Sequence, residues 1–173
     1  MIGAKKVVLC CGAFTNANGI IPNNYKVAGF QPWGKIAYHA QISEKDAEKL
    51  AKIPCWKIIP PGNSNLFPKP DVEYQATTTK TTNYVYGFPP IKYRNGKYYI
   101  KIGHSPYDPL IKNIGGKGLS IGERLGIWFE GKTKKVKEIQ SKSNIFFRSI
   151  LTKLFPKVKF LGGYSCRCVT TKT

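Results

Sequence analysis

The sequence predicts an α+β fold in which a mixed, largely antiparallel sheet is flanked by helices. Residues 33–42 alternate apolar and polar side chains, which is typical of a strand with one buried face. A short helix with a serine cap follows, and an Asn-Gly pair between two strand-like segments indicates a hairpin further along. Antiparallel strands mixed with short helices, without an internal repeat, are typical of the α+β class.

Composition supports a globular protein with a core. The chain has 173 residues, of which 42% are hydrophobic, and this argues against disorder, which requires low hydrophobicity together with high net charge. Five cysteines are too few, and odd in number, for a small disulfide framework, so we expect an intracellular protein in a reducing compartment. Without a run of about 18 apolar residues or a signal peptide, we expect no membrane partner.

The first elements differ in character. Residues 7–13 form a continuous apolar run, which suits a strand buried on both faces in a parallel sheet. No similar strand follows, which suggests that the rest of its sheet belongs to a longer polypeptide. After the half-buried strand, Ser43 caps a predicted helix over residues 44–53, with Asp46 in its first turn and Pro54 after its end.

The middle of the chain predicts short strands separated by loops. Residues 55–59 form a strand, and the proline-rich residues 60–71 form a loop. Residues 83–88 and 97–103 form two strands around the turn Arg94-Asn95-Gly96. Residues 106–120, rich in glycine and proline, form a long connection.

The last third predicts one clear helix and one strand. Residues 121–129 fit a strand or a helix equally well. Residues 143–155 have near-helical apolar spacing and end at Pro156. Residues 158–170 form a final strand, in which Gly162-Gly163 indicates a bulge or a close backbone approach.

The net charge of +19 raises the question of a nucleic-acid partner. Only four of the 28 basic residues are arginines, whereas paired recognition of phosphates and guanines favours arginine. The scattered lysines are more typical of a solvated surface, so we expect no nucleic-acid partner. A basic single-domain protein that binds nucleic acid or another polyanion remains the alternative, with residues 132–142 and the rings of Tyr98 and Tyr99 as its surface.

Metal and phosphate sites are poorly supported. Cys166 and Cys168 have one residue between them, fewer than the spacing of a zinc knuckle, and His39 and His104 are the only histidines. We therefore expect no metal. Residues 116–118 read Gly-Lys-Gly, but no third glycine follows where a dinucleotide-binding turn requires it.

Lys101 is a candidate catalytic residue because of its face. In its strand, Ile100 and Ile102 share one side, while Tyr99, Lys101 and Gly103 share the other. One interpretation is a solvated lysine on the wet side of a sheet. The other places Lys101 on the wall of a ligand site, where its charge stabilises a developing anion, and where Gly103 leaves room for a flat ring.

Four short segments, in this order, resemble the FAD-dependent amine oxidases of the D-amino-acid oxidase superfamily. The likeness is strongest to the monomeric and peroxisomal sarcosine oxidases, and the chain is also similar to the fructosyl-amine and saccharopine oxidases. In the tail, Cys168 is followed by two residues and then Thr-x-Thr, as in that family. The other segments are Gly12-Ala13-Phe14, the run from Tyr84 to Pro89, and Lys101-Ile102-Gly103-His104.

The resemblance implies roles for individual residues. Gly12, Ala13 and Phe14 would lie against the flavin, and Cys168 would attach it as a thioether. Tyr86 would face the substrate, and Lys101 would promote reaction with oxygen. His104 is the candidate active-site histidine, although it follows Gly103 directly, where the family usually has Tyr-His or His-His.

The resemblance also implies an organisation and a reaction. Residues 1–20 would be the last strand and turn of the FAD-binding domain, residues 21–160 the substrate-binding domain, and residues 161–173 a return strand toward the flavin site. The intact enzyme would be a cytoplasmic or peroxisomal monomer. It would oxidise the C–N bond of a small secondary amine or N-substituted amino acid, with O₂ as acceptor, giving an imine and hydrogen peroxide. Without the Gly-x-Gly-x-x-Gly unit that binds FAD, we expect the chain alone to be inactive.

Overall fold

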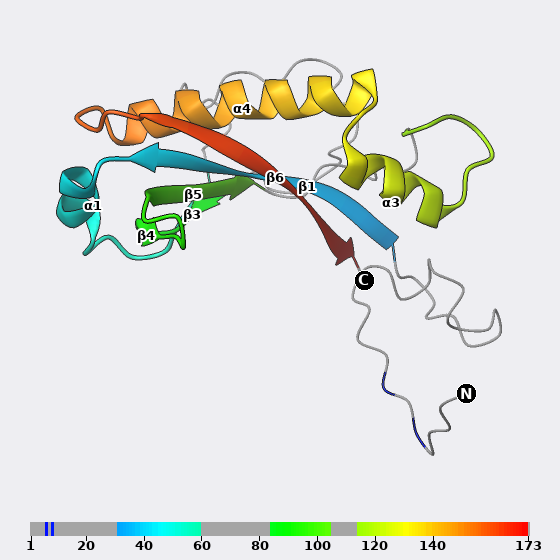
Figure 1. The fold of residues 1–173 in the computed structure, drawn as a ribbon, viewed down its shortest axis with the longest axis horizontal. Helices are drawn as coiled ribbons and strands as arrows, with labels where there is room; N and C mark the ends of the chain where they lie inside the picture. Colours follow the sequence, from blue (N-terminus) through cyan, green and yellow to red (C-terminus); the bar gives the residue numbers. More distant parts are fainter. Residues whose placement is uncertain (1–5, 7, 9–30, 60–83, 105–113, 173) are drawn as a thin grey trace.

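The computed structural model describes residues 6, 8, 31–59, 84–104 and 114–172. Figure 1 shows a twisted sheet with one long helix lying along it. The described elements are, in chain order, β1 (Gln31–Ile42), α1 (Glu44–Leu50), β2 (Trp56–Ile58), β3 (Val85–Gly87), β4 (Ile91–Lys92), β5 (Tyr98–His104), α3 (Ile121–Glu130), α4 (Lys134–Leu154) and β6 (Gly162–Lys172). None of these helices is long and apolar enough to cross a membrane.

The six strands form one sheet in the order β2-β3-β5-β1-β6, with β4 paired to β5. Every described pairing is antiparallel. The predicted α+β class and the antiparallel sheet with its helices are therefore confirmed. The parallel-type strand predicted at residues 7–13 lies outside the described residues, as does the predicted loop at 60–71.

β1 is the strand predicted from alternation, but it is more deeply buried than predicted. Ile36 and Ile42 face the core as expected. The other face was predicted to be wet, yet His39 is 4% exposed and Ala37 is 1% exposed. This prediction is wrong because aromatic rings from neighbouring segments cover that face; the ring of Tyr164 on β6 stacks on His39.

The described helices start at side-chain caps. The Ser43 Oγ accepts a hydrogen bond from the Asp46 amide at 3.1 Å, which confirms the predicted start of α1. At α3, the side chains of Ser120 and Glu123 cap each other's backbone amides, and Gly131 ends the helix at φ 66°. These local caps decide the ambiguous segment 121–129 in favour of a helix.

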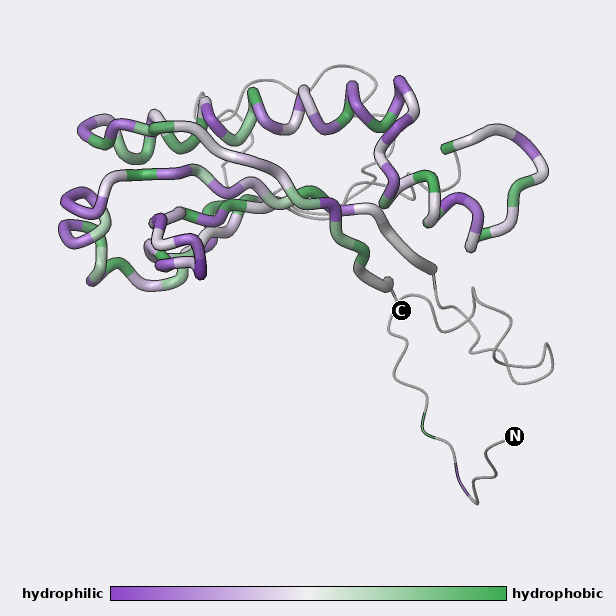
Figure 2. Tube along the Cα trace, viewed as in Figure 1, coloured by the Kyte–Doolittle hydropathy of each residue, from purple (hydrophilic) through white to green (hydrophobic). Residues whose placement is uncertain are grey.

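α4 begins at Lys134, nine residues before the predicted start at 143. Its cap is Thr133, whose Oγ1 accepts from the Val136 amide at 3.4 Å. The lysine-rich run therefore forms the first part of an amphipathic helix, and Figure 2 shows hydrophilic and hydrophobic residues alternating along it. The core under α4 is made of buried side chains from the helices, the strands and one loop: Ile36, Tyr38, Ala40, Ile42, Ala47, Val85, Ile100, Ile102, Ile114, Trp128, Val136, Phe147, Ile150 and Leu151.

The predicted Asn-Gly turn is confirmed, but it joins β4 to β5 rather than β3 to β5. Gly96 has φ 74°, and the amide of Lys97 donates to the Asn95 Oδ1 at 3.1 Å. The final strand begins at Gly162, four residues later than predicted. At Gly163 a side chain would collide with the Tyr38 hydroxyl and the His39 carbonyl, so the predicted close approach is present.

Candidate active site

The sheet face opposite α4 collects polar, aromatic and sulfur-containing side chains, and we call it the polar face. Lys35 pairs with Cys168, and His39 pairs with Lys101 across β1 and β5. Residues directly opposite each other share a face, and every second residue along a strand returns to it. The polar face consists of Lys35, His39, Tyr86, Tyr99, Lys101, Tyr164, Cys166 and Cys168.

Lys101 lies on the face that its strand parity predicted. Its neighbours Ile100 and Ile102 are fully buried on the opposite side. Lys101 itself is half-buried, and its Nζ lies 5.8 Å from the centre of the Phe88 ring. The Phe88 amide also donates to the Lys101 carbonyl at 3.0 Å, so β5 holds that ring beside the lysine. Lys101 is therefore a cation fixed on a partly enclosed face.

Two more lysines lie against aromatic rings next to it. Lys35 Nζ is 4.5 Å from the centre of the Tyr86 ring, and Lys57 Nζ is 4.0 Å from the centre of the Tyr84 ring. Such contacts are worth about 0.5–1 kcal/mol at exposed sites and more when desolvated. Burial lowers the pKa of Lys35, and the nearby Lys101 cation lowers it further. The face thus combines concentrated positive charge with π-surfaces.

The space above Gly103 is not open. Tyr86 and Gly103 are directly opposite each other on β3 and β5. A Cβ placed on Gly103 would lie 2.5 Å from the Tyr86 hydroxyl oxygen. The expectation that Gly103 leaves room for a flat ring is therefore wrong, because Tyr86 already fills that room. Burial raises the pKa of Tyr86, so its phenol stays protonated and keeps a hydrogen to donate.

Cys166 and Cys168 share a single thiolate. The Cys166 thiol, which donates toward the neighbouring sulfur, lowers the pKa of Cys168 to about 6, and the Lys101 and Lys35 cations assist. The same hydrogen bond, followed by burial, raises the pKa of Cys166. When protonated, Cys168 instead donates to the Cys166 carbonyl, with 3.9 Å between Sγ and O. Cys168 is thus the nucleophilic sulfur of the pair.

The backbone around Cys168 is held by the two long helices. The Trp128 indole Nε1 of α3 donates to the Cys168 carbonyl at 3.1 Å. Arg167 Nη2 donates to the Phe129 carbonyl at 2.9 Å, and its Nη1 donates to Gln140 on α4. These bonds fix the strand on which Cys168 lies, and no part of the sequence analysis identified them.

His39 is a further residue of the site that the sequence pattern did not single out. Its ring stacks on Tyr164, with centres 4.7 Å apart, and meets the edge of Tyr93 at 5.6 Å. Its Nδ1 lies 3.8 Å from the Cys166 Sγ. Burial first, and then the Lys101 cation, lower the pKa of His39 to about 4, so the ring is neutral at pH 7. The alternation in β1 gave its face but could not show which rings would cover it.

The other predicted site residues are placed only in part. His104 is the last residue of β5, and its backbone pairs with Val85; its side chain lies outside the described part of the chain. Gly12, Ala13 and Phe14 also lie outside the described residues. The described cluster therefore contains Tyr86, Lys101 and Cys168 of the predicted set.

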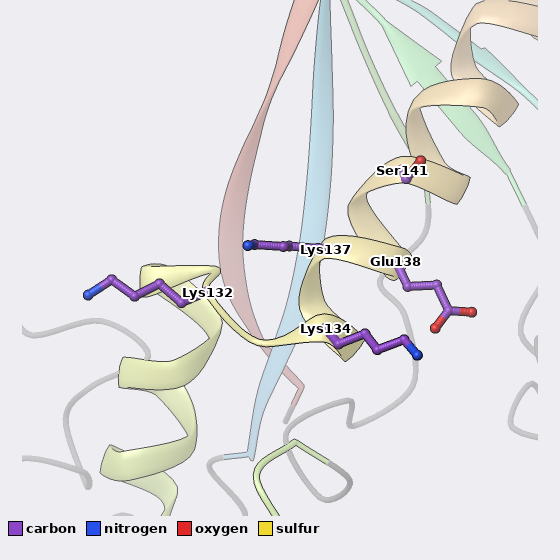
Figure 3. A pocket seen from close by; sticks show the side chains of 5 residues that line it. All are labelled: Lys132, Lys134, Lys137, Glu138 and Ser141. Atoms are coloured by element: carbon purple, nitrogen blue, oxygen red, sulfur yellow. The ribbon is translucent and has the colours of Figure 1, made fainter.

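The lysines at the start of α4 form a separate surface. A shallow hollow of about 570 Å³ is lined by Lys132, Lys134, Lys137, Glu138 and Ser141. Figure 3 shows that the side chains of Lys132 and Lys134 point away from each other, and Lys132 is in an ion pair with Glu130 at 3.6 Å. Cations that diverge in this way provide charge but no built site for a phosphate.

The tyrosines expected beside these lysines in a polyanion-binding surface are used elsewhere. Tyr99 is 5% exposed. The Tyr98 hydroxyl donates to Glu44 at 2.9 Å, and Lys92 Nζ lies 5.3 Å from the centre of the Tyr98 ring. Tyr99 therefore offers no free face on which a base could stack, and the Tyr98 ring already contacts Lys92.

Within the described ranges, no three His, Cys, Asp or Glu side chains are arranged to hold a metal ion. No protein-family model, curated protein or solved structure matches the chain. The chemistry of the site therefore has to be inferred from the polar face itself.

Proposed function

We propose that this chain is part of an FAD-dependent oxidoreductase that oxidises the C–N bond of a small secondary amine or N-substituted amino acid. The acceptor is O₂, and the products are an imine and hydrogen peroxide. One observation carries the proposal: Tyr86, Lys101 and Cys168, which come from three separate segments, share one face of the sheet. These are the residues that the family resemblance assigns to substrate, oxygen and flavin.

The chemistry of these side chains fits the cofactor. When bound, FAD supplies the two-electron redox chemistry. Covalent attachment requires a nucleophilic sulfur, and Cys168 carries the thiolate of its pair. Lys101 provides a fixed cation where negative charge develops on oxygen, and Phe88 shields it from water on one side. Gly12, Ala13 and Phe14 would complete the flavin contacts.

Tyr86 is the residue best suited to meet the substrate. Its hydroxyl lies over Gly103 of β5, and it keeps its proton at neutral pH. A phenol in this position can donate a hydrogen bond to a carboxylate or another acceptor of an amino-acid substrate. Lys35, in contact with the Tyr86 ring, adds positive charge that favours an anionic substrate group.

The native protein, immunopurified with an antibody raised against this chain, tests the proposal. Trypsin cleaves after Arg167 and Lys172, so the peptide of residues 168–172 should carry flavin. The protein should produce hydrogen peroxide when N-methyl amino acids or cyclic secondary amines are added. A flavin-free protein that yields no peroxide with either class would overturn the proposal.

A matched pair of variants tests the register. Cys168→Ser should release flavin on acid precipitation, whereas Cys166→Ser should keep it bound. The two sulfurs lie on the same face of β6, so the opposite result would show that the attachment point is displaced by two residues.

A separate titration tests the polyanion alternative. The purified chain is mixed with a labelled oligonucleotide at two salt concentrations. A phosphate-binding protein would show affinity that falls steeply with salt. Because Lys132 and Lys134 diverge, Tyr99 is buried and the Tyr98 ring contacts Lys92, we expect no tight binding at either concentration.

A further inference from the structure

Two cysteines lie side by side on an edge strand of the described sheet. Cys166 and Cys168 pair with Ala37 and Lys35 of β1, so both point to the polar face. In the described strand order, β6 has a neighbour on one side only. Both thiols are half-buried, whereas Cys55 is exposed and directly precedes β2, at the other end of the described strand order.

The two sulfurs have different surroundings. A hydrogen bond from the Cys166 thiol favours the thiolate of Cys168, and the Lys101 and Lys35 cations assist. Cys166 lies 3.8 Å from Nδ1 of the neutral His39, and its hydrogen bond to Cys168 and its burial raise its pKa although Lys101 acts on it too. One sulfur is therefore a nucleophile, and its neighbour is a thiol that can react with it in a second step.

We propose that Cys166 and Cys168 form a redox site, in which hydrogen peroxide oxidises Cys168 and Cys166 then closes a reversible disulfide. In the first step, the Cys168 thiolate attacks one oxygen of the peroxide. The O–O bond breaks, hydroxide leaves and takes up a proton, and Cys168 becomes a sulfenic acid. In the second step, the Cys166 sulfur attacks the Cys168 sulfur and the S–O bond breaks, so that the thiol proton and the hydroxyl leave as water. Two thiols are oxidised, and one peroxide is reduced to two waters.

The neighbouring thiol matters more than the lowered pKa of Cys168. At pH 7, a pKa of about 6 instead of the ordinary value near 8.5 raises the thiolate fraction by about 30-fold. A less basic thiolate is also a weaker nucleophile, which lowers the reaction rate roughly 10-fold. The net rate advantage is therefore ~3-fold. The pKa decides which sulfur reacts first, and the position of Cys166 decides that the product is a disulfide.

The geometry of the strand makes this disulfide easy to reduce. Two residues in an extended strand advance the Cα by about 6.6 Å, near the upper end of the range that a disulfide spans. Closing the bond therefore requires β6 to pucker, and its free edge among the described strands permits this. A strained disulfide has a higher reduction potential, so we expect glutathione to reverse it.

The site does not depend on the proposed function, because it needs only this chain and peroxide. One consequence does rest on the proposed function. Cys168 would be the flavin attachment point, so the disulfide would prevent attachment until it is reduced.

Trypsin provides a direct test on the full chain. It cleaves between Arg167 and Cys168, so reduced protein yields separate peptides of residues 160–167 and 168–172. After treatment with peroxide and then with a thiol-blocking reagent, we expect a single species with the mass of both peptides less two hydrogens. Glutathione should convert it back. Absence of the linked species at complete peroxide consumption would overturn the proposal.

Single variants test the order of the steps. In Cys166→Ser, a sulfenic-acid probe such as dimedone should label residue 168, whereas Cys168→Ser should show several-fold less label at residue 166. The Cys55→Ser variant should form the linked species as the wild type does. The asymmetry should disappear in urea, because there the lysines no longer lie beside Cys168. Equal labelling of the two sites in the folded chain would contradict the assigned roles.

Discussion

The two faces of the sheet are built on different principles. Under α4, the side chains are apolar and interlocked, and Ile36, Ile100 and Ile102 lie there fully buried. On the polar face, lysines lie near aromatic rings, and the Cys166 thiol lowers the pKa of Cys168. The same strands supply both faces through simple alternation. The fully buried apolar packing therefore lies on one side of this sheet, and the side chains with reactive groups lie on the other.

The largest expected effect comes from breaking the apolar side. Phe147 is fully buried in α4, and its ring stacks on that of Tyr38 with centres 6.5 Å apart. Replacing a buried phenylalanine by alanine removes its contacts and leaves a cavity, so Phe147→Ala should lower the free energy of unfolding by about 3–5 kcal/mol. Urea denaturation of the wild type and the variant measures this loss in the free energy of unfolding. The exposed Ile145→Ala is the control, and similar losses for both variants would contradict this division of the sheet.

How far the sequence predicts the molecule also differs between the faces. The apolar side follows from periodicity, because 36, 38, 40 and 42 alternate in β1 and the apolar residues of α4 recur at helical spacing. The start of α4 at Lys134 was not predicted, because the Thr133 cap is a weak sequence signal and the lysine-rich composition after it suggested only a solvated surface. In α3, by contrast, Ser120 and Gly131 are cap signals that the sequence itself carries.

The polar face is predictable only one strand at a time. Parity placed Lys101 opposite Ile100, and the family resemblance selected Tyr86 and Cys168. The pairing of His39 with Lys101, by contrast, joins strands about 60 residues apart, and no local pattern encodes such a register. The face on which a residue lies can therefore be predicted from alternation within its own strand, whereas contacts between strands have to be observed in the structure.

Acid should destabilise the fold through His39. Its pKa is about 4 in the folded chain, below the ordinary 6.5, so the unfolded state binds more protons between these values. Stability is therefore complete above pH 6.5 and falls as the pH drops through 4. A shift of this size corresponds to about 3 kcal/mol in the free energy of unfolding. The facing groups Lys101, Cys166, Tyr93 and Tyr164 supply no negative charge near pH 5 that would offset it.

Denaturation curves at pH 7 and pH 4, compared between the wild type and His39→Gln, isolate this contribution. The carboxyls of Asp46 and Glu123, whose pKa values are lowered by hydrogen bonds to Ser43 and Ser120, also lose stabilisation in acid, and they do so in both proteins. We expect the variant to lose less stability between the two pH values. Equal losses would show that folding does not lower the pKa of His39.

Removing the charge of Lys101 should affect reactivity far more than stability. In the flavin-loaded enzyme of the proposed function, Lys101→Met keeps the length of the side chain and removes the cation. A preorganised group of this kind is worth about 10²-fold or more, so reoxidation by O₂ should slow by ~100-fold, equivalent to about 2.7 kcal/mol. Stopped-flow measurement separates the rate of reoxidation from the rate of reduction by amine, and the second rate should change little. An unchanged rate of reoxidation would show that Lys101 is a solvated lysine without a part in the reaction.

The smallest effect tests whether the two faces communicate. Trp128 is fully buried in the core under α4, yet its indole Nε1 reaches across to the Cys168 carbonyl at 3.1 Å. Trp128→Phe keeps an aromatic ring but removes that donor, and a carbonyl left without its partner costs about 1–2 kcal/mol. The chain offers a matched control, since the Trp56 Nε1 is buried and finds no hydrogen-bond partner among the described residues.

The paired substitutions therefore separate the hydrogen bond from the loss of ring size. Trp128→Phe and Trp56→Phe each remove the five-membered ring, but only the first removes a bond to β6. If the bond positions Cys168, Trp128→Phe should lower the free energy of unfolding more than Trp56→Phe does, and it should also shift the pH at which the thiolate absorbance of Cys168 appears. A lower free energy of unfolding without that shift would mean that Trp128 stabilises the fold but does not influence the Cys168 thiol. The two faces would then be independent, because the only described bond from the apolar core to the backbone of Cys168 would leave the thiol unaffected.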